Sequence, residues 1–215
     1  MSVDYSEKIL TVKDLEVQFN LRGQVLTAIR GISLDIYKGE SLAIVGESGS
    51  GKSVFTKTFM GMLDKNGKVT KGEILYNGMD LAKFSSEKDW LKIRGKEVAM
   101  VFQDPMTSLN PLKTVGKQIQ EALELHQNLH GRAARERTIE ILSDVGITEP
   151  ERRYKQYPHE FSGGMRQRAV IATAIACNPN ILICDEPTTA LDVTIQAQII
   201  ELLEQLQKKY RLTII

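Results

Sequence analysis

The stretch that decides the fold is Gly46-Glu47-Ser48-Gly49-Ser50-Gly51-Lys52-Ser53. It follows the apolar run 41–45, which we expect to be a strand, and precedes a predicted helix over 54–62; a phosphate-binding loop has this order of elements. The glycines let the backbone turn tightly and direct N–H groups at a triphosphate, and the helix N-terminus adds its positive end. Lys52 is expected to reach the β- and γ-phosphates, and the Ser53 hydroxyl to ligate Mg²⁺. The pattern indicates nucleotide binding and leaves open what the nucleotide does.

The composition is that of a folded chain without strong charge bias. The 215 residues are 42% hydrophobic and 26% charged, and the net charge of +1 gives no basic surface of the kind that binds nucleic acid. No apolar run approaches the ~20 residues of a membrane span, and the first residues lack the apolar core of a signal peptide. Cys177 and Cys184 lack metal-ligand spacing, and we expect them in the core of a protein from a reducing compartment.

Hydrophobic periodicity divides the chain into a β-rich part, a helical insert at about 104–165, and an α/β part. Asn77-Gly78 predicts a type I′ hairpin turn between short strands. The remaining elements are expected as a β-rich segment over 8–45, a short helix over 85–93, strands over 98–102, 181–184 and 212–215, and helices beginning near 115, 133, 165 and 193.

The strand 181–184 ends in two adjacent carboxylates, Asp185 and Glu186. Asp185 is expected to hold Mg²⁺ beside the Ser53 hydroxyl. Glu186 is expected to orient or deprotonate the attacking water. The two elements together predict a site for MgATP hydrolysis.

A second glycine-containing segment, Ser162-Gly163-Gly164, opens the predicted helix at Met165. Its N–H groups, its hydroxyl and the helix N-terminus form a second anion site. One ATP does not need two such sites in one subunit, so this segment is expected to serve the nucleotide of a facing subunit. The alternative is an ordinary serine N-cap followed by glycines that allow close packing.

Taken together, the motifs resemble those of the ATP-binding subunits of ATP-binding-cassette (ABC) transporters. Within that family the chain is most similar to the oligopeptide, dipeptide and nickel importer group. The resemblance rests on the ordered segments 46–53, 100–111, 157–168, 178–195 and Thr189-Ala190-Leu191-Asp192. It implies an α/β fold of the P-loop NTPase, ABC-ATPase type: a single domain over 1–215, an antiparallel β subdomain from 1–40 and 68–100, and a helical subdomain over 104–165.

The resemblance also implies roles for individual residues. Gln103 would reach Mg²⁺ and the attacking water, Phe19 would stack on adenine, and Asp192 would lie at the interface of two ATPase subunits. Catalysis is expected from Glu186, Gln103 and Lys52, and Mg²⁺ ligation from Ser53, Gln103 and Asp185. The residues expected to bind ATP are Phe19, Gly46, Glu47, Ser48, Gly49, Ser50, Gly51, Lys52, Ser53, Val54, Gln103, Ser162, Gly163, Gly164 and Asp185.

The expected function is ATP hydrolysis that powers import of peptides, or of a related small solute such as nickel. The implied partners are a second ATPase subunit, two membrane-spanning permease subunits and, indirectly, an extracytoplasmic solute-binding protein. The signature ending in Met165 favours a hetero pair of ATPases. We expect the chain at the cytoplasmic face of the membrane, as a peripheral subunit, and do not expect it to bind nucleic acid.

Two departures from the family pattern bear on activity. Met165 stands where glutamine is common, and a thioether cannot donate a hydrogen bond to a ribose. The sequence stops at Ile215, before the family's Thr-His-Asp segment, so we expect a C-terminally truncated chain that binds MgATP and hydrolyses it poorly. One alternative is therefore a nucleotide-dependent dimerisation module with little hydrolysis. Another, an ATPase acting on DNA or ribosomes, is disfavoured because the sequence carries no long coiled-coil insert.

Overall fold

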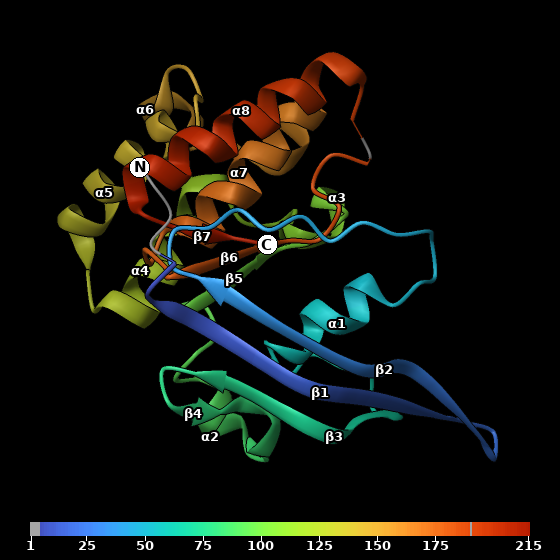
Figure 1. The fold of residues 1–215 in the computed structure, drawn as a ribbon. Coiled ribbons are helices and arrows are strands. Elements are labelled where there is room, and N and C mark those ends of the chain that lie inside the picture. Colours follow the sequence, from blue (N-terminus) through green and yellow to red (C-terminus); the bar gives the residue numbers. More distant parts are fainter. Residues whose placement is uncertain (1–4, 190) are drawn as a thin grey trace. The chain divides into compact units, whose positions relative to one another are not determined.

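The computed structural model describes residues 5–189 and 191–215, so Ala190 of the segment 189–192 lies outside the described residues. The chain divides into two compact units. The first runs to Arg94 and includes Thr213–Ile215, and the second comprises Gly95–Leu212. Figure 1 draws the fold as a ribbon coloured along the sequence.

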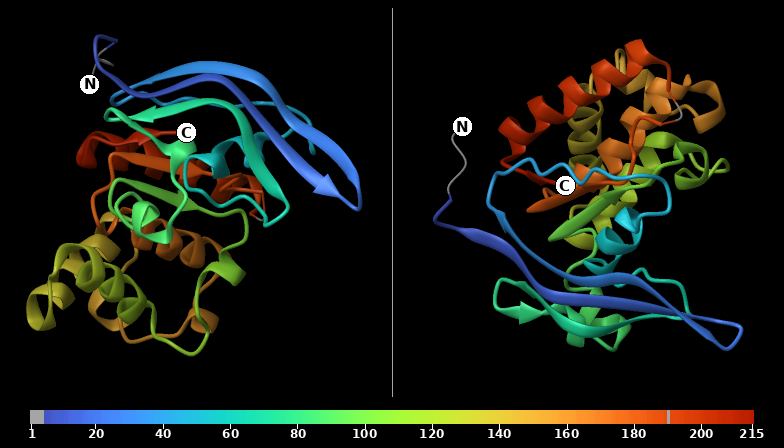
Figure 2. Two further views of the ribbon diagram at one scale, coloured as in Figure 1. Left: turned by 90° about the horizontal axis from the view of Figure 1, so that it is seen from below. Right: turned by 45° about the vertical axis from the view of Figure 1, so that its right-hand side comes forward.

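The first unit is built on an antiparallel sheet with strand order β2-β1-β3-β4 (Figures 1 and 2). Its strands are β1 (Lys8–Leu21), β2 (Gln24–Tyr37), β3 (Gly67–Tyr76) and β4 (Met79–Asp80). Asn77 and Gly78 join β3 to β4 with φ of 47° and 78°, which matches the two positive values of the predicted type I′ turn. The buried side chains of the sheet include Leu10, Val12, Leu15, Val17, Ile36, Ile74 and Tyr76.

Helix α1 (Lys52–Thr58) is shorter than the helix predicted over 54–62. The reason lies at Gly61, which has a φ of 57° and packs against the indole ring of Trp90. Arg94 donates to the carbonyl oxygens of Met60 (2.6 Å) and Gly61 (2.9 Å) and so holds the turn that follows the helix. The unit also contains η1 (Leu81–Lys83) and α2 (Glu87–Trp90), the latter shorter than the helix predicted over 85–93.

The strand predicted over 41–45 does not form. Ser41 makes one parallel bridge with Ile214 of β7 (Thr213–Ile214), and residues 42–47 have no regular secondary structure. At this contact Leu42 N–H donates to the Ile214 carbonyl and Ile214 N–H donates to the Glu40 carbonyl, both at 2.8 Å. A strand needs a continuing ladder, and among the described residues this one stops at Leu42. Val45 is accordingly 91% exposed.

The second unit places helices around two parallel strands, β5 (Val98–Val101) and β6 (Ile181–Cys184) (Figure 2). The register pairs Val98 with Ile181 and Val101 with Cys184. Continuous apolar strands suit a parallel pair covered on both faces, and the sequence predicted strands over 98–102 and 181–184. The helices are α3 (Pro105–Ser108), α4 (Val115–Gln127), α5 (Gly131–Asp144), α6 (Pro150–Arg153), η2 (Pro158–Glu160), α7 (Gly163–Ile175) and α8 (Val193–Tyr210).

A polar cluster fastens α5 to the end of α8 within this unit. Asp144 accepts from the Tyr210 hydroxyl and from Lys209 Nζ, and the Arg137 guanidinium lies over the Tyr210 ring. Burial, followed by the contact with Asp144, raises the pKa of the Tyr210 hydroxyl well above its ordinary value. Within the residues that the structure describes, no helix is long and apolar enough to cross a membrane.

Candidate functional site: the phosphate loop and the strand-end carboxylate

The phosphate loop, residues 46–53, belongs to the first unit and turns tightly before α1. Ser50 N–H donates to the Glu47 carbonyl at 3.2 Å, and Phe55 N–H donates to the Gly51 carbonyl at 2.8 Å. Gly51 has a φ of 96°, and a Cβ there would lie 3.0 Å from Ile29 Cδ1 and 3.2 Å from the Ala28 carbonyl oxygen. Glycine is therefore required at this position by both backbone conformation and space.

Lys52 places its ammonium group against the backbone of this loop. Nζ donates to the carbonyl oxygens of Gly46 at 2.8 Å and Glu47 at 3.0 Å. A cation is thus held beside the segment in which glycines bring backbone N–H groups close together, an arrangement suited to an anionic ligand. Ser53 and Val54 follow in the first turn of α1.

Phe19 lies on β1 in the same unit. It pairs with Leu26 of β2 and Gly67 of β3, and its ring covers Gly67, where a Cβ would lie 2.5 Å from Phe19 Cε1. The ring is partly exposed. Its stacking on adenine stays a prediction.

Gln103 and Glu186 are brought together in the second unit by the register of β5 and β6. Val101 pairs with Cys184, and the chain continues two residues beyond each strand to reach these side chains. Gln103 Nε2 donates to Glu186 Oε2 at 3.0 Å. Asp185 N–H donates to the Val101 carbonyl at 3.0 Å, so the carboxylate pair begins where the parallel ladder ends. The carboxyl edge of parallel strands is where ligands bind in open α/β sheets.

The backbone at Glu186 is strained. Its φ is 49°, a left-handed value that costs a residue with a Cβ about 1–2 kcal/mol. Thr189 N–H donates to the Glu186 carbonyl at 3.3 Å, and the Thr189 hydroxyl donates to Glu186 Oε2 at 3.1 Å. Sequence reasoning missed Thr189, although it lay within the quoted segment 189–192. The available signal was its spacing of three residues from Glu186 across Pro187, a residue favoured at the second position of a turn.

The segment Ser162-Gly163-Gly164 begins α7. Ser162 Oγ accepts from Met165 N–H at 3.3 Å, which is an N-cap. Gly164 packs against α8, because a Cβ there would lie 3.1 Å from Ile195 Cγ2. Within the chain, the contacts of this segment are those of a serine N-cap followed by a glycine that allows close packing. Binding of a facing subunit's nucleotide stays a prediction.

Asp192 is the N-cap of α8. Its Oδ1 accepts from Ile195 N–H at 3.0 Å, and Gln196 N–H donates to its carbonyl at 2.9 Å. Asp192 is exposed, so its carboxylate caps α8 at the surface. Its contact with a second ATPase subunit stays a prediction.

The predicted site residues thus fall into two groups. Phe19 and the segment 46–54 belong to the first unit, and Gln103, Ser162–Gly164, Asp185, Glu186 and Asp192 belong to the second. The structure brings Lys52 onto the phosphate loop and Gln103 onto Glu186. That the two groups meet around one nucleotide stays a prediction.

Comparison with known proteins gives the family. The model of the ABC transporter family matches residues 29–189. The chain is 58% identical over 207 residues to the oligopeptide transport ATP-binding protein AmiE of Streptococcus pneumoniae, covering 96% of this chain and 58% of that protein. It is 54% identical over 210 residues to the dipeptide transport ATP-binding protein DppD of Bacillus subtilis, covering 97% and 62%. The chain therefore spans about three fifths of the length of these relatives.

Solved structures agree with the fold. A dimeric, post-hydrolysis structure of the ATP-binding cassette MJ0796 bound to ADP and Pi matches with a TM-score of 0.82 and 30% identity, covering 95% of this chain and 85% of that one. CbiO1 from Clostridium perfringens, part of the transporter complex cbiONQ, matches with a TM-score of 0.79 and 30% identity, covering 97% and 77%. The predicted α/β fold of the ABC-ATPase type is confirmed. The chain belongs to the ABC transporter family, as one of its ATP-binding cassettes.

Proposed function

We propose that this chain is the ATP-binding and ATP-hydrolysing part of a transporter that imports peptides. The observation that carries the proposal is the identity of 54–58% with oligopeptide and dipeptide transport ATP-binding proteins over 96–97% of the chain. Peptides are favoured over nickel because these relatives are named for oligopeptides and dipeptides.

The phosphate loop is proposed to hold the triphosphate. Lys52, already tied to the loop carbonyls, would exchange those partners for the β- and γ-phosphate oxygens. Ser53, Gln103 and Asp185 offer only oxygen donors to a metal, which is the donor set that Mg²⁺ prefers. When bound, Mg²⁺ neutralises charge on the phosphates.

Glu186 is proposed as the group that accepts a proton from the attacking water. A general base must be oriented, and Gln103 and Thr189 both donate to its Oε2. The charge that develops on the γ-phosphoryl oxygens would be stabilised by Lys52 and by the N–H groups at the start of α7 of a second ATPase subunit. MJ0796 is dimeric in its structure with ADP and Pi, which supports a paired arrangement.

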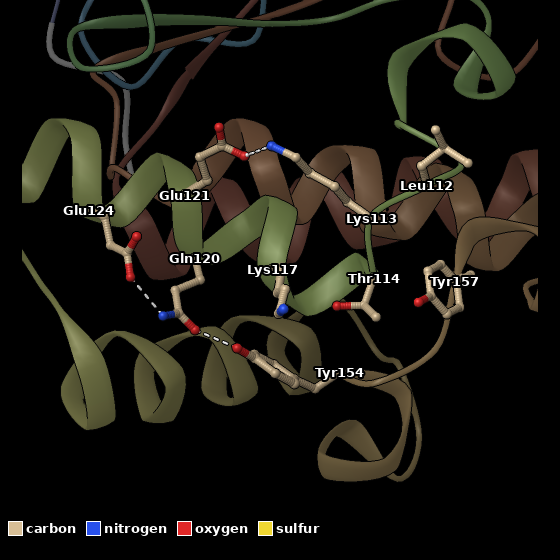
Figure 3. Close-up of a pocket in the computed structure, with 9 residues that line it drawn as sticks. All are labelled: Leu112, Lys113, Thr114, Lys117, Gln120, Glu121, Glu124, Tyr154 and Tyr157. Atoms are coloured by element: carbon tan, nitrogen blue, oxygen red, sulfur yellow. Dashed lines mark hydrogen bonds and ion pairs between the residues drawn. The ribbon is translucent and has the colours of Figure 1, made fainter.

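We assign coupling to the permease subunits to the helical part, residues 104–165. A cavity of about 550 Å³ lies beside α4 and is drawn in Figure 3; its lining includes Leu112, Lys117, Tyr154 and Tyr157. Leu112 is 86% exposed and Tyr157 40% exposed, so apolar surface is available there for a partner. A permease segment seated here would place the chain at the cytoplasmic face of the membrane. The assignment of an antiparallel β subdomain to 1–40 and 68–100, within a single domain over 1–215, stays part of this proposal.

The test is equilibrium binding of MgATP to the wild-type chain and to Lys52→Ala, with Lys57→Ala of the same helix as the matched control. We expect micromolar binding that Lys52→Ala abolishes and Lys57→Ala leaves intact. Phosphate release is then measured on the same samples. Binding without phosphate release would contradict the hydrolytic function, and no binding by the wild type would contradict the whole proposal.

A further inference from the structure

Thr189 makes a side-chain hydrogen bond to Glu186 that the sequence motifs did not predict. Its hydroxyl donates to Glu186 Oε2 at 3.1 Å, the same oxygen that accepts from Gln103 Nε2 at 3.0 Å. Among the described residues, no hydrogen bond is formed by Glu186 Oε1. The carboxylate is therefore held through one oxygen while the other keeps its lone pairs for a water molecule.

The position of Thr189 relative to Glu186 is fixed by a local turn. Thr189 N–H donates to the Glu186 carbonyl at 3.3 Å, and Leu191 N–H donates to the Thr188 carbonyl at 3.0 Å. Pro187 occupies the second position of the first turn, where its fixed φ is favoured. Glu186, whose carbonyl closes the first of these turns, has a left-handed φ of 49°. Because the Thr189 hydroxyl and the Glu186 carboxylate lie within one turn, the hydrogen bond between them does not depend on the position of more distant segments.

The two donors differ in what else they are expected to do. Gln103 is proposed to contact Mg²⁺. A side chain that turns toward the metal can lose its hydrogen bond to Glu186. The Thr189 hydroxyl makes no other hydrogen bond among the described residues, so it can keep Oε2 in place while the water is activated. A base whose rotamer is fixed loses less orientational freedom in the transition state.

We propose that Thr189 is a positioning residue that orients the Glu186 carboxylate for ATP hydrolysis. This inference rests on the proposed ATPase function. Thr189 acts through Glu186 and does not itself need to touch the nucleotide. The adjacent Thr188, whose side chain makes no hydrogen bond among the described residues, provides a matched control.

The experiment compares the wild type with Thr189→Val, Thr189→Ser and Thr188→Val. MgATP affinity and single-turnover hydrolysis are measured on the same preparations, if needed with the paired ATPase subunit present. We expect Thr189→Val to lower the hydrolysis rate about 10-fold, which is less than the rate loss expected when the general base itself is removed. The affinity for MgATP should stay within about 2-fold of the wild type. Thr189→Ser and Thr188→Val should retain the wild-type rate.

The same substitution is then made in the Glu186→Gln background, where no carboxylate remains to be oriented. We expect no further loss of rate, because residues that act as a unit are not additive. An equal loss in both backgrounds, or a wild-type rate for Thr189→Val, would overturn the positioning role and leave the ATPase function standing. A wild-type protein that binds MgATP without hydrolysing it would instead overturn the ATPase function, and the role of Thr189 with it.

Discussion

The carboxamide of Gln103 donates to Oε2 of Glu186 at 3.0 Å, although 83 positions separate the two residues in the sequence. Both side chains follow parallel strands by two residues, and the pairing of Val101 with Cys184 sets them level. The contact joins the residue proposed to sense Mg²⁺ to the residue proposed as the base. An exchange of Gln103 between these two partners would link nucleotide binding to activation of the water.

Substitution of Gln103 therefore tests the relationship directly. Gln103→Ala removes a donor to Glu186 and a proposed Mg²⁺ ligand, so we expect turnover to fall roughly 10- to 100-fold. Gln198→Ala, on the exposed side of α8, is the control and should leave turnover unchanged. Equal turnover in both variants and the wild type would show that the contact has no part in hydrolysis.

The proposed permease surface is tested at Leu112. Leu112→Asp puts a charge on an 86% exposed position beside the cavity, so folding should be unaffected while an apolar contact is lost. We expect co-purification with the permease subunits to weaken at least 10-fold, with MgATP binding unchanged. Leu125→Asp, 73% exposed on α4 and outside the cavity lining, is the control. A similar loss in both variants would argue against this cavity as the docking surface.

Asp80 predicts a dependence of stability on pH. Burial alone would raise the pKa of Asp80, but N–H bonds from Ile74 and Ala82 and the ammonium of Lys83 together lower it. A lowered folded-state pKa stabilises the protein above the unfolded value of ~3.9, and this contribution is lost as the pH falls through the folded value.

Asp80→Asn should accordingly lower the free energy of unfolding by about 1–2 kcal/mol at neutral pH, measured by urea denaturation. The difference from the wild type should shrink as the pH falls below ~4. Asp64→Asn is the control, because Asp64 is exposed and its carboxylate makes no hydrogen bond or ion pair among the described residues. A difference that stays constant over this pH range would contradict the role of ionised Asp80.

Gly61 predicts a large packing penalty. Its φ is 57°, and a Cβ would lie 2.1 Å from Trp90 Cε2, so Gly61→Ala must displace an indole that is only 9% exposed. We expect a loss of about 2–4 kcal/mol in the free energy of unfolding. Gly78→Ala, with a φ of 78° and no atom within 4 Å of the added Cβ, isolates the backbone cost and should lose only about 1 kcal/mol. Equal losses would mean that Trp90 moves without cost.

The two cysteines should be inert in the folded protein. Burial raises the pKa of Cys177 to about 11 and that of Cys184 to about 12, and Cys177 Sγ also donates to the Ala122 carbonyl at 3.3 Å. The thiolate is the reactive form, so iodoacetamide at mildly alkaline pH should label neither residue until denaturant is added. Rapid labelling of the native chain, detected by mass spectrometry, would contradict this arrangement.

The sequence predicted the elements whose formation depends on neighbours in the chain. The hairpin turn at Asn77-Gly78 follows from two residues that tolerate positive φ, and the bounds of β6 and α8 follow from apolar periodicity between turn residues. The strand expected over 41–45 was wrong, because its apolar pattern is satisfied only by neighbouring strands, and the described ladder stops at Leu42. The end of α1 was also misplaced, since Trp90 and Arg94 decide it from a distance.

By itself, the sequence determined the family and predicted the loop 46–53 and the carboxylates Asp185 and Glu186 as site residues, because spacing along the chain encodes the loop, the strand end and the helix start. Only the tertiary structure decided which distant side chains meet. The register of β5 and β6 joined Gln103 to Glu186, whereas the bond from the Thr189 hydroxyl to the same oxygen forms within a local turn. Sequence patterns specify elements through local conformation, whereas hydrogen bonds between elements depend on strand register and backbone direction, which the chain acquires only on folding.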